Sequence, residues 1–150
     1  MPEHRRKAEP HRRTRTAHQS ETAEDYVETI AEILQEKTVC RLADLSRRFG
    51  VSNVTAHRII ERLQREGLVI SEPYQPVTLT AQGQRLAARC RKRHEVVYQF
   101  LTAIGVDPAT AAIEAEGIEH HVGAGTLQKF EEMTRTLRSD SAGSASSATE

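Results

Sequence analysis

The stretch EAEGIEHH at residues 114–121 concentrates side chains that can bind a metal ion. On a helix, Glu116, Glu119 and His120 have the spacing i, i+3, i+4, which places their side chains on one face within a single turn. Carboxylates held so close repel one another unless a cation lies between them. The stretch therefore predicts a metal site built on a helix.

Further candidate ligands lie on two other predicted helices. Asp25 and Glu28 are three residues apart and flank an apolar helical stripe. His94 falls between Cys90 and Val97 at helical spacing, so its side chain is expected to face the interior. A lone inward histidine is more often a core residue than a ligand, but carboxylates available on two other helices favour the ligand interpretation.

The combined set offers four carboxylates and two imidazoles: Asp25, Glu28, His94, Glu116, Glu119 and His120. Oxygen-rich sites with some imidazole and no thiolate suit Mn²⁺ or Fe²⁺. Six side chains exceed what one such ion usually takes from a protein, which leaves room for two ions per subunit. Cys40 and Cys90 lack metal-binding spacing and are expected to be reduced, packed thiols.

Catalytic motifs are not supported by the same residues. The run from His94 begins like a zinc-protease HExxH motif, but its fifth residue is Tyr98. Di-iron enzymes need paired Glu-x-x-His motifs, whereas Glu116 and His120 are four apart. No P-loop, dinucleotide-binding turn or nucleophile elbow is present. We expect a protein that is not an enzyme, with a metal-dependent enzyme on a helical scaffold as the alternative.

Residues 42–67 have the pattern of a helix-turn-helix. A short amphipathic helix stops at Gly50, and Ser52 can cap a second helix. Two β-rich segments, 68–72 and 77–80, follow and are joined by proline-rich turn residues. The pattern predicts a winged helix-turn-helix.

The second helix of this motif fits a DNA-reading role, because its inner face is apolar and its outer N-terminal face is not. Arg58 can pair bidentately with a guanine edge, and Val54 can contact a thymine methyl. Arg47, Thr55 and Arg62 are expected near phosphates. The full set of predicted DNA contacts is Arg47, Ser52, Val54, Thr55, Arg58 and Arg62. A helical hairpin used only for packing is the alternative.

The rest of the chain predicts helices and two polar ends. A long helix is expected from about 81 to 103, a helix opened by Asp107-Pro108 through EAEGIEHH, and a last helix near 126–137. The basic N-terminal arm and the small, polar C-terminal tail have the composition of disordered segments. The 150 residues carry zero net charge. No apolar stretch approaches membrane-spanning length, so we expect a soluble, cytoplasmic protein without a membrane partner.

Four segments resemble the manganese transport regulators of the DtxR/MntR metalloregulator family: EDYVETI, RHEVVYQFL, IGV and EGIEHH. The resemblance covers about residues 22–138. It implies a mainly α fold, with a winged helix-turn-helix domain carrying a small β-hairpin and a C-terminal helical dimerisation domain. The expected organisation is a disordered basic arm at 1–20, a DNA-binding domain at 21–80, a metal-binding and dimerisation domain at 81–138 and a disordered tail at 139–150.

The family's metal ligands match all six candidates. Its iron-sensing members have methionine at the position of Asp25 and cysteine at that of Glu116, so the carboxylates here favour manganese. The resemblance implies a homodimeric repressor of metal-uptake genes that binds double-stranded operator DNA when Mn²⁺ is bound. An Fe²⁺-responsive regulator and a metal-independent winged-helix DNA-binding protein are the alternatives.

Overall fold

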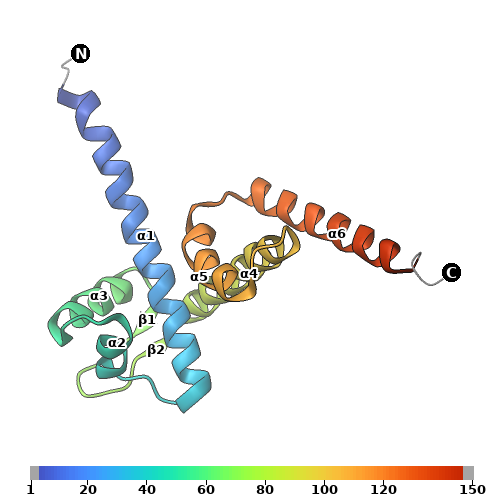
Figure 1. Cartoon of the computed structure of the whole chain (residues 1–150). Coiled ribbons are helices and arrows are strands. Elements are labelled where there is room, and N and C mark those ends of the chain that lie inside the picture. The colour runs from blue at the N-terminus through green and yellow to red at the C-terminus, as the bar shows by residue number, and fades with distance from the viewer. Residues whose placement is uncertain (1–3, 147–150) are drawn as a thin grey trace. The chain divides into compact units, whose positions relative to one another are not determined.

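The computed structural model describes residues 4–146, with side chains over residues 14–143, and it is mainly helical (Figure 1). Its elements are α1 (His4–Lys37), α2 (Leu42–Phe49), α3 (Asn53–Arg65), β1 (Val69–Ile70), β2 (Thr78–Leu79), α4 (Ala81–Ala103), α5 (Pro108–Ile118), the 3₁₀ turn η1 (Glu119–His121) and α6 (Ala124–Ser146). The chain forms an N-terminal unit up to Ala88 and a C-terminal unit from Arg89. The predicted mainly α class with a small hairpin is confirmed.

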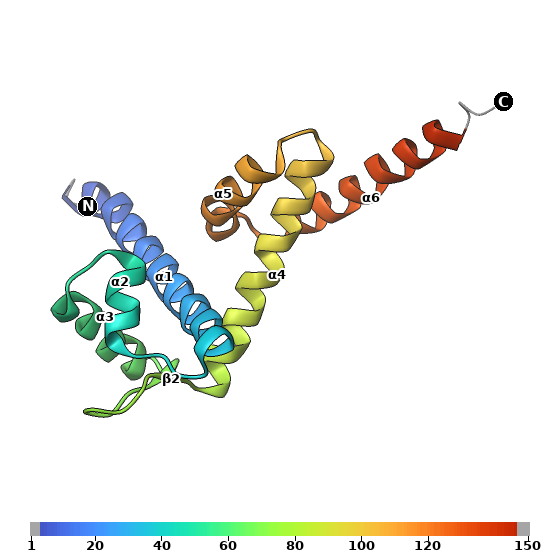
Figure 2. The same ribbon diagram turned by 60° about the horizontal axis from the view of Figure 1, so that its bottom comes forward.

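The apolar stripe of α1 forms the centre of the N-terminal unit, where α2 and α3 lie beside it (Figure 2). Tyr26, Ile30 and Ile33 recur at helical spacing and are at most 2% exposed. Tyr26 also stacks on Phe49 of α2, with ring centroids 4.1 Å apart. Burying one such side chain stabilises a fold by about 1.5–3 kcal/mol, so this stripe fixes α1 in the unit.

α2 and α3 form the predicted helix-turn-helix. α2 ends at Gly50, whose φ of 63° lies in the left-handed region that glycine adopts without steric cost. Ser52 precedes α3, and its Oγ accepts the backbone N–H of Thr55 at 3.1 Å, as expected for an N-cap. The inner face of α3 is formed by Ala56, Ile60 and Leu63, all buried. Both helix boundaries at this turn are confirmed.

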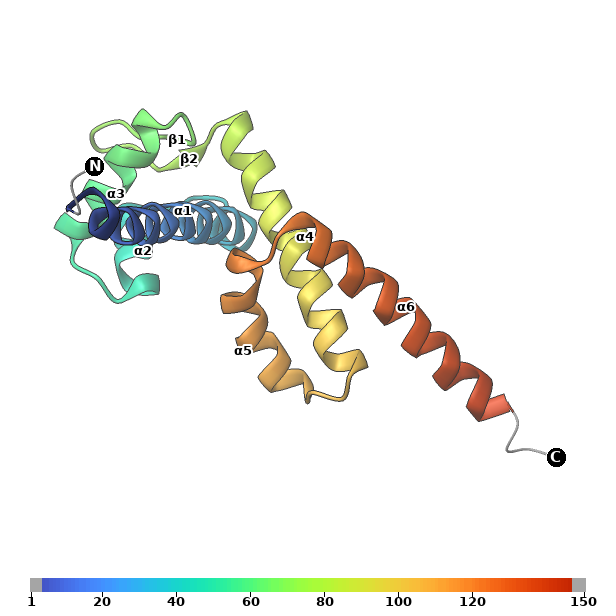
Figure 3. The same cartoon turned by 90° about the horizontal axis from the view of Figure 1, so that it is seen from above.

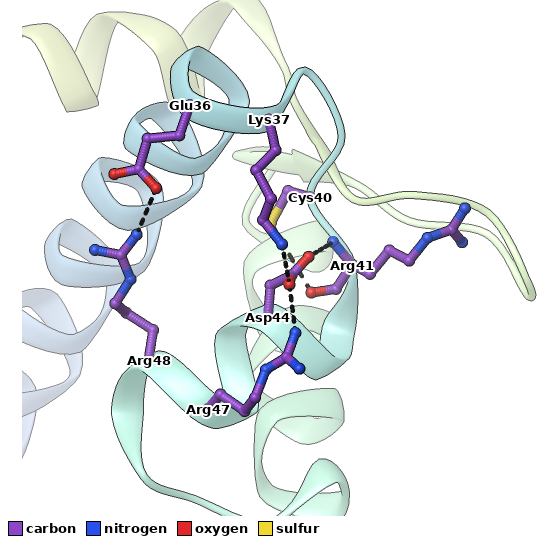
Figure 4. Close-up of polar contacts among 7 residues, drawn as sticks. All are labelled: Glu36, Lys37, Cys40, Arg41, Asp44, Arg47 and Arg48. Carbon is purple, nitrogen blue, oxygen red and sulfur yellow. Dashed lines mark hydrogen bonds and ion pairs between the residues drawn. The ribbon is translucent and has the colours of Figure 1, made fainter.

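Asp44 ties the end of α1 to the start of α2 (Figure 4). Its carboxylate accepts hydrogen bonds from Lys37 Nζ at 2.5 Å and from the Arg41 backbone N–H at 3.0 Å. Arg47 Nη2 donates to the same carboxylate at 2.7 Å. These donors, Lys37 foremost, lower the pKa of Asp44 from 3.8 to about 2.

The wing is shorter than the sequence predicted. β1 and β2 pair antiparallel, with Val69 opposite Leu79 and Ile70 opposite Thr78. The turn between them contains Pro73 and Pro76, which have no backbone N–H to donate to a ladder. Val77 donates its backbone N–H to the Cys40 oxygen at 2.8 Å, outside the wing, so pairing between the two strands does not extend over the whole of 68–72 and 77–80.

The C-terminal unit is built on the second half of α4, with α5 running back beside it (Figure 3). Val97 and Leu101 of α4 pack on Ala111 and Ala115 of α5. The alanines leave short side chains at the contact, which lets the two helices approach closely. Phe100 of α4 also stacks on a ring of α6, with centroids 4.1 Å apart.

The start of α5 has the predicted cap. The Asp107 carboxylate accepts the backbone N–H of Thr110 at 3.1 Å, and Pro108 is the first helical residue. Because this cap fixes where α5 begins, it also sets the register of the predicted ligand Glu116 near the far end of the helix.

The first and last helices extend into the two end segments that were predicted to be disordered. α1 begins at His4, inside the expected arm at 1–20, and α6 runs to Ser146, inside the expected tail at 139–150. The disorder was predicted because these two segments contain no run of apolar residues that could be buried. A helix already nucleated on a core can extend into polar sequence, because each added residue gains one hydrogen bond without a new nucleus. Residues 1–3 and 147–150 lie outside the described part of the chain.

None of the described helices is long and apolar enough to cross a membrane.

Gly83 of α4 provides a test of packing in the N-terminal unit. A Cβ added there would lie 2.0 Å from the backbone oxygen of Leu68, so the backbone would have to shift. We expect Gly83→Ala to lower the free energy of unfolding by about 1–3 kcal/mol, measured by urea denaturation followed by circular dichroism. Gly125→Ala in α6 is the matched control, since nothing lies within 4 Å of its Cβ. Equal effects of the two substitutions would contradict the packing.

Asp44 generates a pH-dependent prediction. Its folded-state pKa of about 2 is below the ordinary 3.8, so its contribution to stability is full above the ordinary value and is lost as the pH falls toward 2. Asp44→Asn is expected to be less stable than the parent at pH 7, and the difference is expected to vanish near pH 2. Urea denaturation across this range measures it, and a difference independent of pH would count against the role of the carboxylate.

Candidate functional site

Three of the six predicted metal ligands converge within the C-terminal unit. His94 on α4, Glu116 on α5 and Glu119 on η1 each offer one ligand atom, and these atoms all lie within 4.8 Å of one another. Ligands on opposite sides of a divalent ion, each at about 2.1 Å, are separated by about 4.2 Å. A small side-chain adjustment is therefore enough to close the three atoms around one ion.

His94 and Glu116 face each other across this group. His94 Nδ1 lies 3.5 Å from Glu116 Oε1. The same nitrogen is shielded from solvent and makes no hydrogen bond within the described residues. The Glu116 side chain is 63% exposed, so it can rotate toward the imidazole. A buried polar atom normally has a partner, and an imidazole nitrogen next to a carboxylate suits metal ligation.

Glu119 brings a buried carboxylate to the group. Its side chain is 1% exposed, and its Oε1 lies 3.7 Å from Nε2 of His120. Buried charges in proteins are paired or coordinate metals. The carboxylates of Glu116 and Glu119, together with the imidazole of His94 on α4, therefore fit a divalent cation with oxygen and imidazole ligands. His120 lies beside the group through its contact with Glu119.

The helix expected to run through EAEGIEHH stops early, which corrects the predicted geometry. α5 ends at Ile118, and Glu119–His121 forms a 3₁₀ turn. Gly117 lowers helix propensity at this point. The Arg93 guanidinium also donates from Nη2 to the backbone oxygens of Glu119 and Val122, the second at 3.3 Å. As a result Glu119 is buried and Glu116 is exposed, in place of one shared helical face.

Arg93 is the residue that sequence reasoning missed. In the sequence it is the last member of the basic run RCRKR, and only its position directly before His94 could have drawn attention to it. Its contacts to the turn depend on how α4 packs against η1, which no local pattern encodes.

The two predicted ligands of α1 belong to the N-terminal unit. Asp25 and Glu28 are separated by almost one helical turn, and both are partly buried. Their part in metal binding stays a prediction.

Cys40 and Cys90 are both buried. Burial, with Asp44 nearby, raises the pKa of the Cys40 thiol to about 11, so this group is protonated at neutral pH, as expected for a packed thiol.

The predicted DNA-reading residues of α3 lie on its outer face. Ser52, Val54, Thr55 and Arg58 are all exposed, and Val54 is 62% exposed although it is apolar. An exposed valine beside an arginine at the start of a recognition helix is suited to contact base edges. The residues predicted to read DNA bases are therefore exposed, and their contact with DNA stays a prediction.

The two remaining arginines already have protein partners. The Arg47 side chain is 75% exposed while it pairs with Asp44, so it can reach a phosphate from this position. Arg62 is 24% exposed, and it donates to the Gln19 backbone oxygen at 3.1 Å. Arg62 thereby joins α3 to α1. A phosphate contact by Arg62, which stays a prediction, would require it to exchange this partner.

Two family models cover most of the chain. Residues 18–77 match "Iron dependent repressor, N-terminal DNA binding domain". Residues 80–146 match "Iron dependent repressor, metal binding and dimerisation domain". The three converging ligands lie in the second match, and the helix-turn-helix lies in the first.

Individual relatives agree with the family models. The chain is 41% identical over 124 residues to the transcriptional regulator MntR of Escherichia coli O6:H1, covering 83% of this chain and 80% of that protein. It is 30% identical to the HTH-type transcriptional regulator MntR of Bacillus subtilis, covering 79% and 84% of the two chains. A solved manganese-dependent transcriptional repressor in complex with manganese superposes with a TM-score of 0.66 at 31% identity. That match covers 75% of this chain and 52% of the solved one, so this chain spans about half its length.

Proposed function

The chain belongs to the iron-dependent repressor family, the DtxR/MntR metalloregulators, and we propose that it is a manganese-activated transcriptional repressor that binds operator DNA as a homodimer. The observation that carries this proposal is the convergence of His94, Glu116 and Glu119. Members of the family are DNA-binding regulators, and we infer that this chain is not an enzyme and acts in the cytoplasm.

Manganese is the proposed effector because the ligand atoms are mostly hard. Carboxylates suit Mn²⁺, and imidazole is compatible with it. The curated relatives named above are transcriptional regulators named MntR, and the solved relative is a manganese-dependent repressor in complex with manganese. We propose that Asp25, Glu28 and His120 complete the ligand set, with room for two ions per subunit. Fe²⁺ is the competing effector.

Dimerisation is proposed through the C-terminal unit. Its fully buried apolar cluster, among the described residues, is small: Val97, Leu101, Ala111 and Ala115, with six partly buried apolar side chains packed against it. A core of this size gives marginal stability on its own. The same unit exposes Ile104 by 52%, Ile113 by 75% and Met133 by 50%. A second copy of the chain that covers these side chains would supply the missing apolar burial.

In the proposed mechanism the ligands act as a switch on conformation. His94, Glu116 and Glu119 would hold the ion, and its positive charge would offset the repulsion between the two carboxylates. Without it, repulsion between the carboxylates disfavours the closed arrangement. Once drawn together, His94 and the two glutamates hold α4 against α5 and η1. We infer that this arrangement fixes the two α3 helices of the dimer at the separation of successive major grooves, about 34 Å. If metal binding favours this arrangement by a few kcal/mol, the fraction of operator DNA that is bound changes substantially.

The metal ligands generate the first functional prediction. We expect His94→Ala and Glu116→Ala each to weaken Mn²⁺-dependent retardation of the DNA upstream of the protein's own gene by at least about tenfold, because even the loss of a supporting partner typically costs 10–100-fold in metal affinity. Both variants should remain folded dimers by circular dichroism and gel filtration.

Glu114→Ala is the matched control, because Glu114 is an exposed carboxylate on the same helix outside the ligand group. It should behave like the parent. Unchanged retardation by both ligand variants would defeat the assignment, and a panel with Fe²⁺ and Zn²⁺ would separate manganese from its competitors.

The exposed face of α3 generates the second functional prediction. Arg58→Ala is expected to weaken binding to operator DNA by about 1–3 kcal/mol and to weaken binding to random DNA much less, because a guanine contact specifies sequence. Arg65→Ala, a charge change at the other end of α3, serves as control. Fluorescence anisotropy with both DNAs measures the two affinities. An equal loss on random DNA would make Arg58 a phosphate contact.

A further inference from the structure

Arg93 links the segments that carry the metal ligands. It directly precedes His94 on α4. Its Nη2 donates to the backbone oxygen of Glu119 and, at 3.3 Å, to that of Val122. These two oxygens lie at the start of η1 and just after its end. One guanidinium therefore holds the turn that presents Glu119 and His120.

The turn needs such an anchor because local sequence provides little to fix it. The last carbonyls of a helix have no partner within the helix. Ile118, which directly precedes η1, has an apolar side chain and makes no side-chain cap. Gly117 and Gly123, on either side of the turn, have no side chain, and a Cβ added at either would meet no atom within 4 Å, so no side-chain packing at these two positions helps to fix the turn. A cation at a helix C-terminus also interacts favourably with the helix dipole.

We propose that Arg93 is a positioning residue for the metal centre: by bonding the backbone of η1 it holds the Glu119 carboxylate at the site and so raises the affinity for the ion. This inference rests on the proposed function. Arg93 Nη2 carries two N–H groups fixed in the guanidinium plane and bonds both carbonyls; the ammonium of lysine is one atom shorter in reach and rotates freely, so it does not reproduce this contact. Losing these bonds leaves η1 to be ordered when the metal binds, and that ordering lowers affinity.

The charge of Arg93 alone would act in the opposite direction. A guanidinium near a divalent ion repels it, so removing the charge would raise metal affinity if repulsion were its main effect. A neutral substitution therefore lowers metal affinity if Arg93 positions the turn and raises it if charge repulsion dominates. Lysine keeps the charge and loses the two-carbonyl contact, so it lowers affinity only if Arg93 positions the turn.

The test is a calorimetric titration of the full-length dimer with Mn²⁺. Arg93→Gln and Arg93→Lys are both expected to raise the Kd about 10–100-fold, the range typical of residues that orient metal ligands. Arg91→Gln and Arg91→Lys are the matched controls, because Arg91 is an exposed arginine on the same helix, and they should bind like the parent. Parental affinity in Arg93→Lys, or tighter binding in Arg93→Gln, would overturn the positioning role.

A second measurement keeps the proposal testable if the substitutions perturb the fold. Hydrogen exchange of the metal-free protein should be faster at amides 119–123 in Arg93→Lys than in the parent, with α1 and α3 unchanged. Equal exchange rates at the turn in the variant and the parent would contradict the anchoring role of Arg93.

At saturating Mn²⁺ the variant should still retard operator DNA, with its midpoint shifted by the same factor as the Kd. If the parent itself bound no Mn²⁺, the proposed function would fail. If the parent bound and both Arg93 variants matched it, only the positioning role would fail.

Discussion

The repulsion between two neighbouring carboxylates is the constraint on which the proposed activity depends. Glu116 and Glu119 offer oxygens within 4.8 Å of each other and of a nitrogen of His94, and one of the two carboxylates is almost fully buried. Such an arrangement is unfavourable for the protein alone and becomes favourable with a divalent cation. A site that gathers like charges can report metal concentration, since the free energy of ion binding offsets their repulsion.

The surrounding structure serves to bring those groups together with little freedom. The alanines of α5 permit close packing on α4, and the cap at Asp107 sets the register of α5. Arg93 then fixes the turn that follows. In the N-terminal unit, the stripe of α1 and the hydrogen bonds of Asp44 hold the helix-turn-helix together, so that α3 presents its outer face as a rigid surface. Rigid elements on both sides let a small local change alter binding elsewhere.

Features with a local cause could be predicted from the sequence. Ser52, Gly50 and the Asp107-Pro108 pair each fix the backbone through their own chemistry, and the structure has their caps as expected. Features that depend on a distant partner were missed. The 3₁₀ turn reflects a guanidinium from another helix, and Arg62 bonds a carbonyl 43 residues away along the chain. The extended ends of α1 and α6 were missed for a related reason, since composition reports the absence of a core and says little about a helix already nucleated beside one.

The most direct measurement is the position of the ion itself. Crystals of the full-length protein grown with Mn²⁺ and measured at the manganese absorption edge would give an anomalous difference map that locates the metal independently of any assumption about its ligands. The account predicts a peak within coordination distance of His94, Glu116 and Glu119 in every subunit. A map whose manganese peaks all lay away from these three side chains, with the protein fully loaded, would contradict it.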